Sequence, residues 1–219
     1  MTLEGTNTFL VGSRPCLVID PGPADQGHLD AVRSAAAERG GIDGVLLTHS
    51  HADHAEGADA LGAHLIELAD GESHGPIAAV ATPGHAPDHL CFLMGPACFS
   101  GDLVLGEGST IVPPDGGSLT AYLDSLRRLQ NLELDLICPG HGPWITDPTA
   151  KLAEYVEHRL DRERRLLAAL ERGERSKAVL LDEAWWDVPA ELRPAAAMAM
   201  EAHLQKLEGE GRLPGPLSD

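Results

Sequence analysis

Short apolar runs alternate with Gly-, Pro- and Asp-rich segments from Thr8 to about Ile145. Such runs, bounded by turn residues, predict β-strands. They lie at 9–11, 17–19, 45–47, 78–81, 90–94, 98–99 and 134–138. Helical periodicity falls between them, at 28–39, 55–68 and 119–132. Strands and helices mixed in this order predict an α/β fold, a sandwich with the sheets inside and the helices on the outer faces.

The pattern changes after Pro148, where helical periodicity continues without strands. Asp147 is the expected N-cap of the first of these helices. Three helices are predicted, followed by a short hairpin turn, at 149–172, 176–186, 189–208 and 209–213. We therefore divide the chain into a first domain, 1–147, and a small C-terminal winged-helix-like domain, 148–219.

The first of these helices carries two charges inside its apolar stripe, Arg159 and Glu163. The two residues are four apart and so are neighbours on one helix face. A charged pair in this place predicts either a desolvated ion pair or the edge of a wet cleft, and we expect the two side chains to act as a unit.

Metal-ligand residue types gather where the predicted strands of the first domain end. Four of them fall within six residues directly after the strand at 45–47, and three more follow later strands. The seven candidates are His49, His51, Asp53, His54, His85, Asp102 and His141. Imidazole with carboxylate suits zinc, manganese or iron, and seven ligands exceed what one tetrahedral ion accepts. The set predicts two metal ions, most simply Zn²⁺, with Mn²⁺ or Fe as alternatives.

A hypothetical division gives His49, His51 and His85 to one ion, Asp53, His54 and His141 to the other, and makes Asp102 the bridge. Water between two ions roughly 3.5–4 Å apart loses a proton near neutral pH and becomes a hydroxide nucleophile. The set therefore predicts a hydrolase. Asp53 is the candidate catalytic residue because its carboxylate can orient that hydroxide or carry its proton. Asp20, which ends the run at 17–19, is a candidate to brace one ligand imidazole.

Other histidines and the cysteines lack such a setting. We expect ordinary structural roles for His28, His64, His74, His158 and His203. The four cysteines show no C-x-x-C spacing, and this is typical of buried, reduced thiols.

The charge distribution limits the partners. The net charge is −18, and residues 1–149 carry 5 Lys/Arg against 20 Asp/Glu. Nucleic acid binding needs local positive charge. Such charge is available only in 151–177, with 8 basic against 6 acidic residues. A solvated helix with mixed charges explains this segment most simply, and Arg159, Arg162 and Arg165 are the candidate substrate-binding residues within it.

No charged and apolar leader pattern opens the chain, and no apolar run approaches membrane-spanning length. We expect a cytoplasmic protein with no membrane partner. The sequence leaves its oligomeric state open.

The motif His49-x-His51-x-Asp53-His54, followed in order by His85, Asp102 and His141, resembles the metallo-β-lactamase superfamily across residues 6–146. Segments 5–12, 82–85, 101–110 and 139–143 are similar to the beta-lactamase-like protein 2 group of endoribonucleases. The tail at 158–163 and 203–211 resembles that group's winged-helix extension. The resemblance implies a four-layer αββα fold, a dinuclear zinc site and cleavage of single-stranded RNA.

Several features depart from related patterns. Asp102 stands where true β-lactamases of the superfamily usually have Cys, and His51 where diiron flavoproteins have Glu, so neither activity is expected. The family normally has a strand before the segment that begins at Gly5, so we expect either a missing edge strand or an internal start. The stretch between His54 and His85 is also short, which puts one or two strands and part of a pocket wall in question.

Three functions follow from these features. Hydrolysis of single-stranded RNA is the leading one. The alternative is a glyoxalase-II-like thioesterase, whose usual C-terminal domain is helical without a wing. A third is a nucleic-acid-binding regulator that keeps the first domain as a scaffold, against which the intact ligand set argues.

Overall fold

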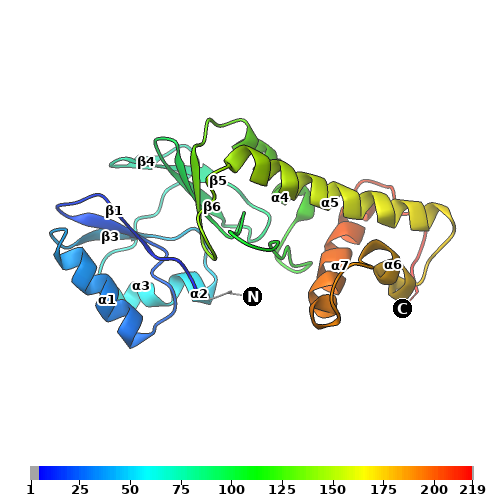
Figure 1. Cartoon of the computed structure of the whole chain (residues 1–219), viewed down its shortest axis with the longest axis horizontal. Coiled ribbons are helices and arrows are strands. Elements are labelled where there is room, and N and C mark those ends of the chain that lie inside the picture. Colours follow the sequence, from blue (N-terminus) through cyan, green and yellow to red (C-terminus); the bar gives the residue numbers. More distant parts are fainter. Residues whose placement is uncertain (1–4, 219) are drawn as a thin grey trace.

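The computed structural model describes residues 5–218, which form two parts along the long axis of the molecule (Figure 1). The first part holds two sheets. One sheet has the strand order β1-β2-β3, with β1 (Phe9–Val11), β2 (Cys16–Ile19) and β3 (Ile42–Leu46). The other has the order β4-β5-β6-β7-β8, with β4 (Ser73–His74), β5 (Ile77–Ala81), β6 (Leu90–Met94), β7 (Ala97–Gly101) and β8 (Leu136–Pro139). The pairs β2–β3 and β7–β8 are parallel, and the other pairs are antiparallel.

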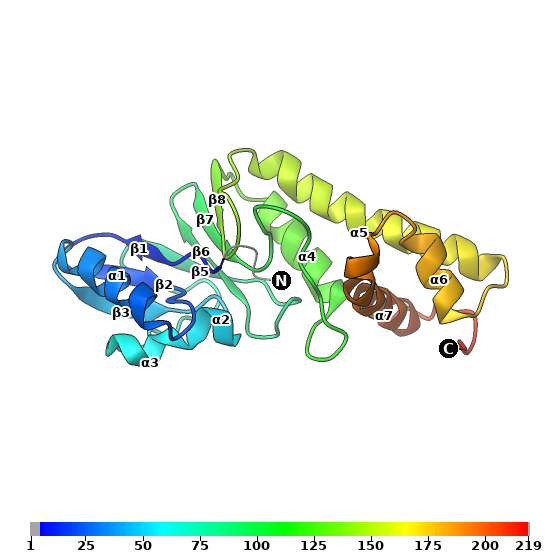
Figure 2. The ribbon, with the colours of Figure 1, turned by 60° about the horizontal axis from the view of Figure 1, so that its bottom comes forward.

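The alternation of side chains along each strand builds the layers. Leu17 and Ile19 of β2 point between the two sheets, whereas Val18 points to the outer face, which helix α1 (Gln26–Ala37) covers. Phe92 of β6 likewise points between the sheets, and its neighbour Cys91 packs beneath helix α4 (Leu119–Gln130). Helices therefore cover both outer faces (Figure 2), and the predicted four-layer αββα sandwich is confirmed.

Helix α5 (Pro148–Glu171) lies beside α4 and continues into the second part (Figure 1). Its N-cap is Asp147, as predicted, whose carboxylate accepts a hydrogen bond from the backbone N–H of Ala150 at 3.0 Å. Side chains near its start join the core under α4, and those near its end join the core of the second part. One continuous helix is therefore shared between the two parts.

Helices α6 (Lys177–Ala184) and α7 (Arg193–Gly209) share a core with the end of α5, and the 3₁₀ turn η1 (Ala190–Leu192) leads into α7. The expected hairpin at 209–213 is wrong. Helix α7 runs on to Gly209, and the chain turns at Gly211, whose φ of +68° favours glycine. The tail then returns to the start of α6, where Ser218 pairs with Ser176 in an isolated parallel bridge.

The single helix predicted at 55–68 is also wrong. The short helix α2 (Ala52–Ala55) ends where the predicted helix begins. Only α3 (Gly57–Leu61) falls in its first half, and Gly62 ends α3 in the left-handed conformation. The chain beyond Gly62 runs along β3, because the backbone N–H of Ile66 donates to the carbonyl of Val45 at 2.8 Å. The apolar residues that suggested a helix therefore take part in this pairing with β3 instead.

The four cysteines are buried and free, as expected. Within residues 5–218, no helix has both the length and the apolar character needed to cross a membrane. The expectation of a missing edge strand or an internal start concerns the segment ahead of Gly5, which lies outside the described residues.

Candidate metal centre

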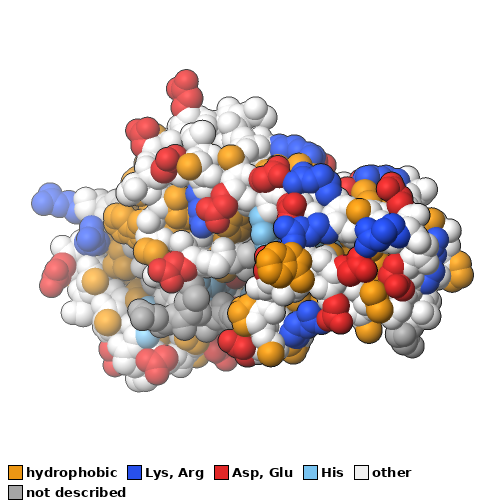
Figure 3. Space-filling model, turned by 45° about the vertical axis from the view of Figure 1, so that its right-hand side comes forward, with side chains coloured by type: hydrophobic (Ala, Val, Ile, Leu, Met, Phe, Trp, Pro, Cys, Tyr) orange, Lys and Arg blue, Asp and Glu red, His pale blue; other side chains and the backbone are white. Residues whose placement is uncertain are grey.

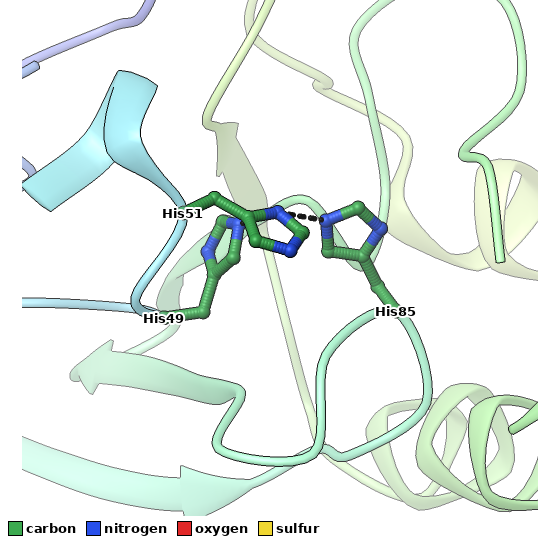
Figure 4. A group of neighbouring side chains, drawn as sticks. All are labelled: His49, His51 and His85. Carbon is green, nitrogen blue, oxygen red and sulfur yellow. Dashed lines mark hydrogen bonds between the residues drawn. The ribbon is translucent and has the colours of Figure 1, made fainter. Parts of the chain in front are cut away.

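The structure brings all seven ligand candidates together at one end of the two facing sheets. They come from the segments that follow β3, β5, β7 and β8, and Asp53 and His54 lie in the short helix α2, so four separate strand ends position them. Figure 4 shows His49, His51 and His85 with their rings turned toward one another. This convergence could not arise from a surface histidine cluster within one loop.

The first group of donors is His49, His51 and His85. His51 Nδ1 lies 3.0 Å from His49 Nε2 and 3.0 Å from His85 Nε2. Two nitrogens bound to one tetrahedral zinc lie about 3.3 Å apart, given a Zn–N bond of about 2.0–2.1 Å. The spacing of these three imidazoles therefore fits one metal ion.

The second group is Asp53, His54 and His141. His141 Nε2 lies 3.3 Å from His54 Nε2 and 3.4 Å from Asp53 Oδ2. Asp102 stands between the groups: its Oδ1 is 3.3 Å from His54 Nε2 and its Oδ2 is 3.7 Å from His85 Nε2. One carboxylate oxygen thus faces each group, as a bridging ligand requires.

The Nδ1 atoms of His85 and His141 indicate that a cation belongs between the two groups of donors. His85 Nδ1 contacts the carbonyl of Ile111 at 2.7 Å, and His141 Nδ1 contacts the carbonyl of Gly5 at 2.9 Å. A carbonyl only accepts hydrogen bonds, so both Nδ1 atoms carry hydrogen and, in the neutral rings, both Nε2 atoms present lone pairs to the centre. Converging lone pairs repel one another unless a positive ion lies between them.

A buried carboxylate oxygen gives a second sign. Asp102 Oδ1 has no hydrogen-bond partner within the described part of the chain. Gly140 lies against it, and a Cβ there would come within 2.7 Å of Asp102 Oδ1 and 2.7 Å of His54 Cε1. An unpartnered, tightly enclosed carboxylate oxygen is costly without a cation, so the residues fit a two-metal centre.

The electrostatics show that the buried carboxylates attract positive charge into the site. Burial opposes charge on His54, but the neighbouring carboxylates of Asp102 and Asp20 outweigh it and raise the pKa of His54 to about 10. Burial would also raise the pKa of Asp102, yet the nearby imidazoles of His141 and His54 hold it well below its usual range. Burial lowers the pKa of His49 and of His85, so these rings are neutral donors.

Asp20 braces the site, as predicted. Its Oδ2 accepts a hydrogen bond from His54 Nδ1 at 2.9 Å and from Thr48 Oγ1 at 2.6 Å, and its Oδ1 accepts from the backbone N–H of Thr48 at 2.7 Å. The Thr48 hydroxyl in turn lies 3.1 Å from His49 Nδ1. One carboxylate therefore orients two of the imidazoles.

We expect Asp20→Asn to weaken zinc binding by about 10–100-fold, because the amide group has a single acceptor oxygen for these donors. Competition with a chromogenic chelator measures the affinity. Asp43→Asn is the matched control, since Asp43 makes the same kind of contact, at 3.0 Å, with the exposed His74. Equal zinc affinity in the two variants would contradict the role of Asp20.

His89 escaped the sequence-based prediction, although it is 1% exposed beside the site. Its Nε2 accepts a hydrogen bond from the backbone N–H of Asp102 at 3.2 Å, and its Nδ1 lies 2.9 Å from Thr82 Oγ1. Burial lowers its pKa to about 3, so the ring is neutral and can accept. The available signal was its place four residues after His85, directly before β6.

A family model described as the metallo-beta-lactamase superfamily matches residues 1–67 and 66–141. The chain belongs to the metallo-beta-lactamase superfamily. Members of this superfamily are metal-dependent hydrolases, and so is this protein. A second model, the beta-lactamase associated winged helix domain, matches residues 185–213 and identifies the C-terminal part.

Similar proteins carry different names. A beta-lactamase-like protein 2 homolog of Drosophila melanogaster is 32% identical over 255 residues, which cover 97% of this chain and 85% of the relative. An atrochrysone carboxyl ACP thioesterase of Aspergillus chevalieri is 37% identical over 200 residues, covering 80% and 64%. A metallo-beta-lactamase family protein from Thermus thermophilus has the same fold, with a TM-score of 0.76, 22% identity and coverage of 94% and 89%.

In this metallo-beta-lactamase superfamily member, the metal-site residues open into a cavity of about 660 Å³ that we call the chamber. The far wall of the chamber comes from the C-terminal part and is apolar. This wall contains Trp185, Val188, Leu192, Ala195, Ala196 and Ala199. The chamber therefore joins the candidate catalytic residues to an apolar surface.

The candidate substrate-binding arginines divide into two kinds. Arg159 and Arg162 line the chamber. Arg165 is not among its lining residues and pairs with Asp161, one turn earlier on α5, at 2.7 Å. Figure 3 shows Lys and Arg side chains over the C-terminal part with acidic side chains set among them.

The predicted pair of Arg159 and Glu163 does not form. Arg159 donates hydrogen bonds to Ser109 Oγ and to the carbonyl of Thr110, on the chamber wall. Glu163 turns the other way and accepts from Lys206 of α7 at 2.7 Å and from Arg212 at 2.9 Å. The four-residue spacing brings the two side chains to one face, but each turns to partners elsewhere in the chain. The expectation of a cleft edge holds for Arg159, which lines the chamber.

Proposed function

We propose that this hydrolase cleaves a small acyl thioester whose acyl group lies against the apolar wall of the chamber. The observation that carries the proposal is the chamber itself, with metal-site residues at one end and Trp185, Val188 and Ala196 at the other. Apolar walls with a few placed polar groups are typical of small-molecule sites.

The residues would divide the chemistry among them. His49, His51 and His85 would hold one metal ion, Asp53, His54 and His141 the other, and Asp102 both. The bound metal pair, which we propose to be zinc, would supply Lewis acidity toward the carbonyl and a nucleophile from water. Asp53 is the catalytic candidate because its Oδ2 faces His141 while its Oδ1 has no partner within residues 5–218. That oxygen would take up the proton from the attacking water and return it to the leaving thiolate, which departs as the thiol.

Cleavage of single-stranded RNA is the second candidate. It is supported by the similarity to beta-lactamase-like protein 2 homologues and by Arg159 and Arg162 at the chamber. It ranks second because positive charge for a polyanion is scarce. Arg162 is paired with Asp187, and Arg164 and Arg165 are both paired with Asp161, in a chain of net charge −18. The thioesterase name of the Aspergillus chevalieri relative also favours the first candidate.

A side-by-side assay separates the two. The zinc-loaded protein is expected to hydrolyse the pentanoyl thioester of N-acetylcysteamine or S-lactoylglutathione faster than it cleaves a single-stranded RNA oligonucleotide, and chelation is expected to stop both reactions. RNA cleavage without thioester turnover, weakened by salt and by Arg162→Glu and Arg165→Glu, would assign the protein to the second candidate.

A further inference from the structure

We propose that Arg159 forms an anion-binding subsite in the chamber, which selects acyl thioesters whose acyl group ends in a carboxylate. The choice of thioester rests on the proposed function, whereas the anion subsite itself does not. Three features of Arg159 support the subsite: its burial, its lack of a counter-ion and its place in the chamber that the metal-site residues and the apolar wall also line.

Arg159 is 4% exposed, and its guanidinium lies 5.4 Å from the centre of the Tyr122 ring. Only Nη2 has hydrogen-bond partners, Ser109 Oγ at 3.0 Å and the carbonyl of Thr110. Nε is buried without a partner, and Nη1 has none within residues 5–218. The side chain is held in place, and the two N–H groups of Nη1 remain to be offered to a ligand.

Other buried charges of the same helix are matched by a counter-ion. The two terminal nitrogens of Arg162 meet the two oxygens of Asp187 at 2.6 and 3.1 Å, and Glu163 meets Lys206 and Arg212. Arg159 has no carboxylate within 4.0 Å anywhere in the described part of the chain. An unpaired buried cation is destabilising, so the place of the missing anion is open to a ligand.

The surroundings of Arg159 leave its charge uncompensated. Burial first, and then the charges of Arg159 and Arg162, lower the pKa of the neighbouring His158 to about 4. The two acidic residues that line the chamber away from the metal site, Glu107 and Asp115, are exposed, and neither pairs with Arg159. In a chain that is acidic elsewhere, this local field favours a compact anion.

The ligand chemistry follows from the guanidinium, which binds carboxylate or phosphate through charge-assisted hydrogen bonds. We assign a carboxylate because Arg159 and the metal-site residues line one chamber, in which a dicarboxylic acyl thioester would offer its carbonyl to the metal-site residues and its carboxylate to Arg159. A free phosphate has the same chemistry, so the test includes both anions.

Two thioesters of N-acetylcysteamine with five acyl carbons, glutaryl and pentanoyl, provide the kinetic test. Arg159→Gln is expected to lower kcat/KM for the glutaryl substrate by roughly tenfold to a hundredfold and to change that for the pentanoyl substrate by less than about threefold. Arg165→Gln is the matched control, because it removes the same charge from the same helix outside the chamber. A ratio of the two substrates unchanged by Arg159→Gln would overturn the proposal.

Calorimetric titration of the zinc-loaded protein with glutarate, and separately with inorganic phosphate, tests the anion directly. Wild type and Arg165→Gln are expected to bind glutarate more tightly than Arg159→Gln does; Arg159→Lys, which keeps the charge, is expected to bind with intermediate affinity. Stronger Arg159-dependent binding of phosphate than of glutarate would overturn the carboxylate assignment. Arg159-dependent glutarate binding without thioester turnover would leave the subsite standing and remove the proposed function. If neither Arg159 variant changes glutarate binding while thioester turnover is intact, the anion subsite is ruled out and the proposed function stands.

Discussion

Asp102→Ala and His51→Ala are each expected to reduce hydrolysis by at least about a thousandfold. Asp102 gives one oxygen to each ligand group, at 3.3 and 3.7 Å from the nearest imidazole nitrogens, so its loss leaves both groups incomplete. His51 Nδ1 is the shared contact of His49 and His85. Loss of about 4 kcal/mol of transition-state stabilisation corresponds to a thousandfold in rate.

Elemental analysis and circular dichroism separate this result from misfolding. Wild type is expected to hold close to two transition-metal ions per chain, and both variants to hold fewer with their secondary structure retained. His74→Ala and Asp124→Ala are matched controls on the surface, and both should keep full activity. Undiminished wild-type turnover in a strong chelator, with no metal found after metal-replete growth, would rule out a metal centre.

Glu163→Gln is expected to lower the free energy of unfolding by about 3–5 kcal/mol. Glu163 and Lys206 are 8% and 9% exposed at their side chains and lie 2.7 Å apart between α5 and α7. Loss of the carboxylate leaves the Lys206 ammonium in the interior with only Glu210, at 2.7 Å, as a counter-ion. The expected loss is large because a buried charge, rather than a surface contact, loses its partner.

Urea unfolding of a double-mutant cycle measures this coupling. Glu163→Gln with Lys206→Met is expected to cost less than the sum of the two single changes, whereas Glu163→Gln with Arg159→Gln should be additive. Glu154→Gln breaks an ion pair with Lys151 on the same helix, where Glu154 is 61% exposed, and should cost at most about 1 kcal/mol. Strong coupling of Glu163 to Arg159 would reinstate the pair that the sequence suggested.

The convergence of the seven ligand candidates was predictable because it depends on local signals. Each candidate follows an apolar run, and strand ends of facing sheets meet at one edge. The same reasoning gave Asp20, which directly follows β2 and contacts His54. His89 escaped it because a histidine that accepts from a backbone N–H has no characteristic spacing.

The errors arose where tertiary partners compete with local ones. The periodicity at 55–68 is helical, but Gly62 ends the helix and Ile66 pairs with β3 instead. The spacing of Arg159 and Glu163 suggested a mutual pair, yet the partners lie 49 or 43 residues away along the chain, at Thr110 and Lys206. No pattern within one helix contains that information.

The sharing of α5 has a consequence for cutting or recombining this protein. Its 24 residues extend for about 36 Å, with Leu152 and Tyr155 in the core under α4 and Leu166 and Leu170 in the core of the C-terminal part. Truncation at residue 147 would remove α5 from α4, the helix that covers the five-stranded sheet. It would also remove the apolar wall of the chamber. A chimera that exchanges substrate walls between relatives therefore needs its junction inside α5, between these two sets of side chains, with the helical phase preserved.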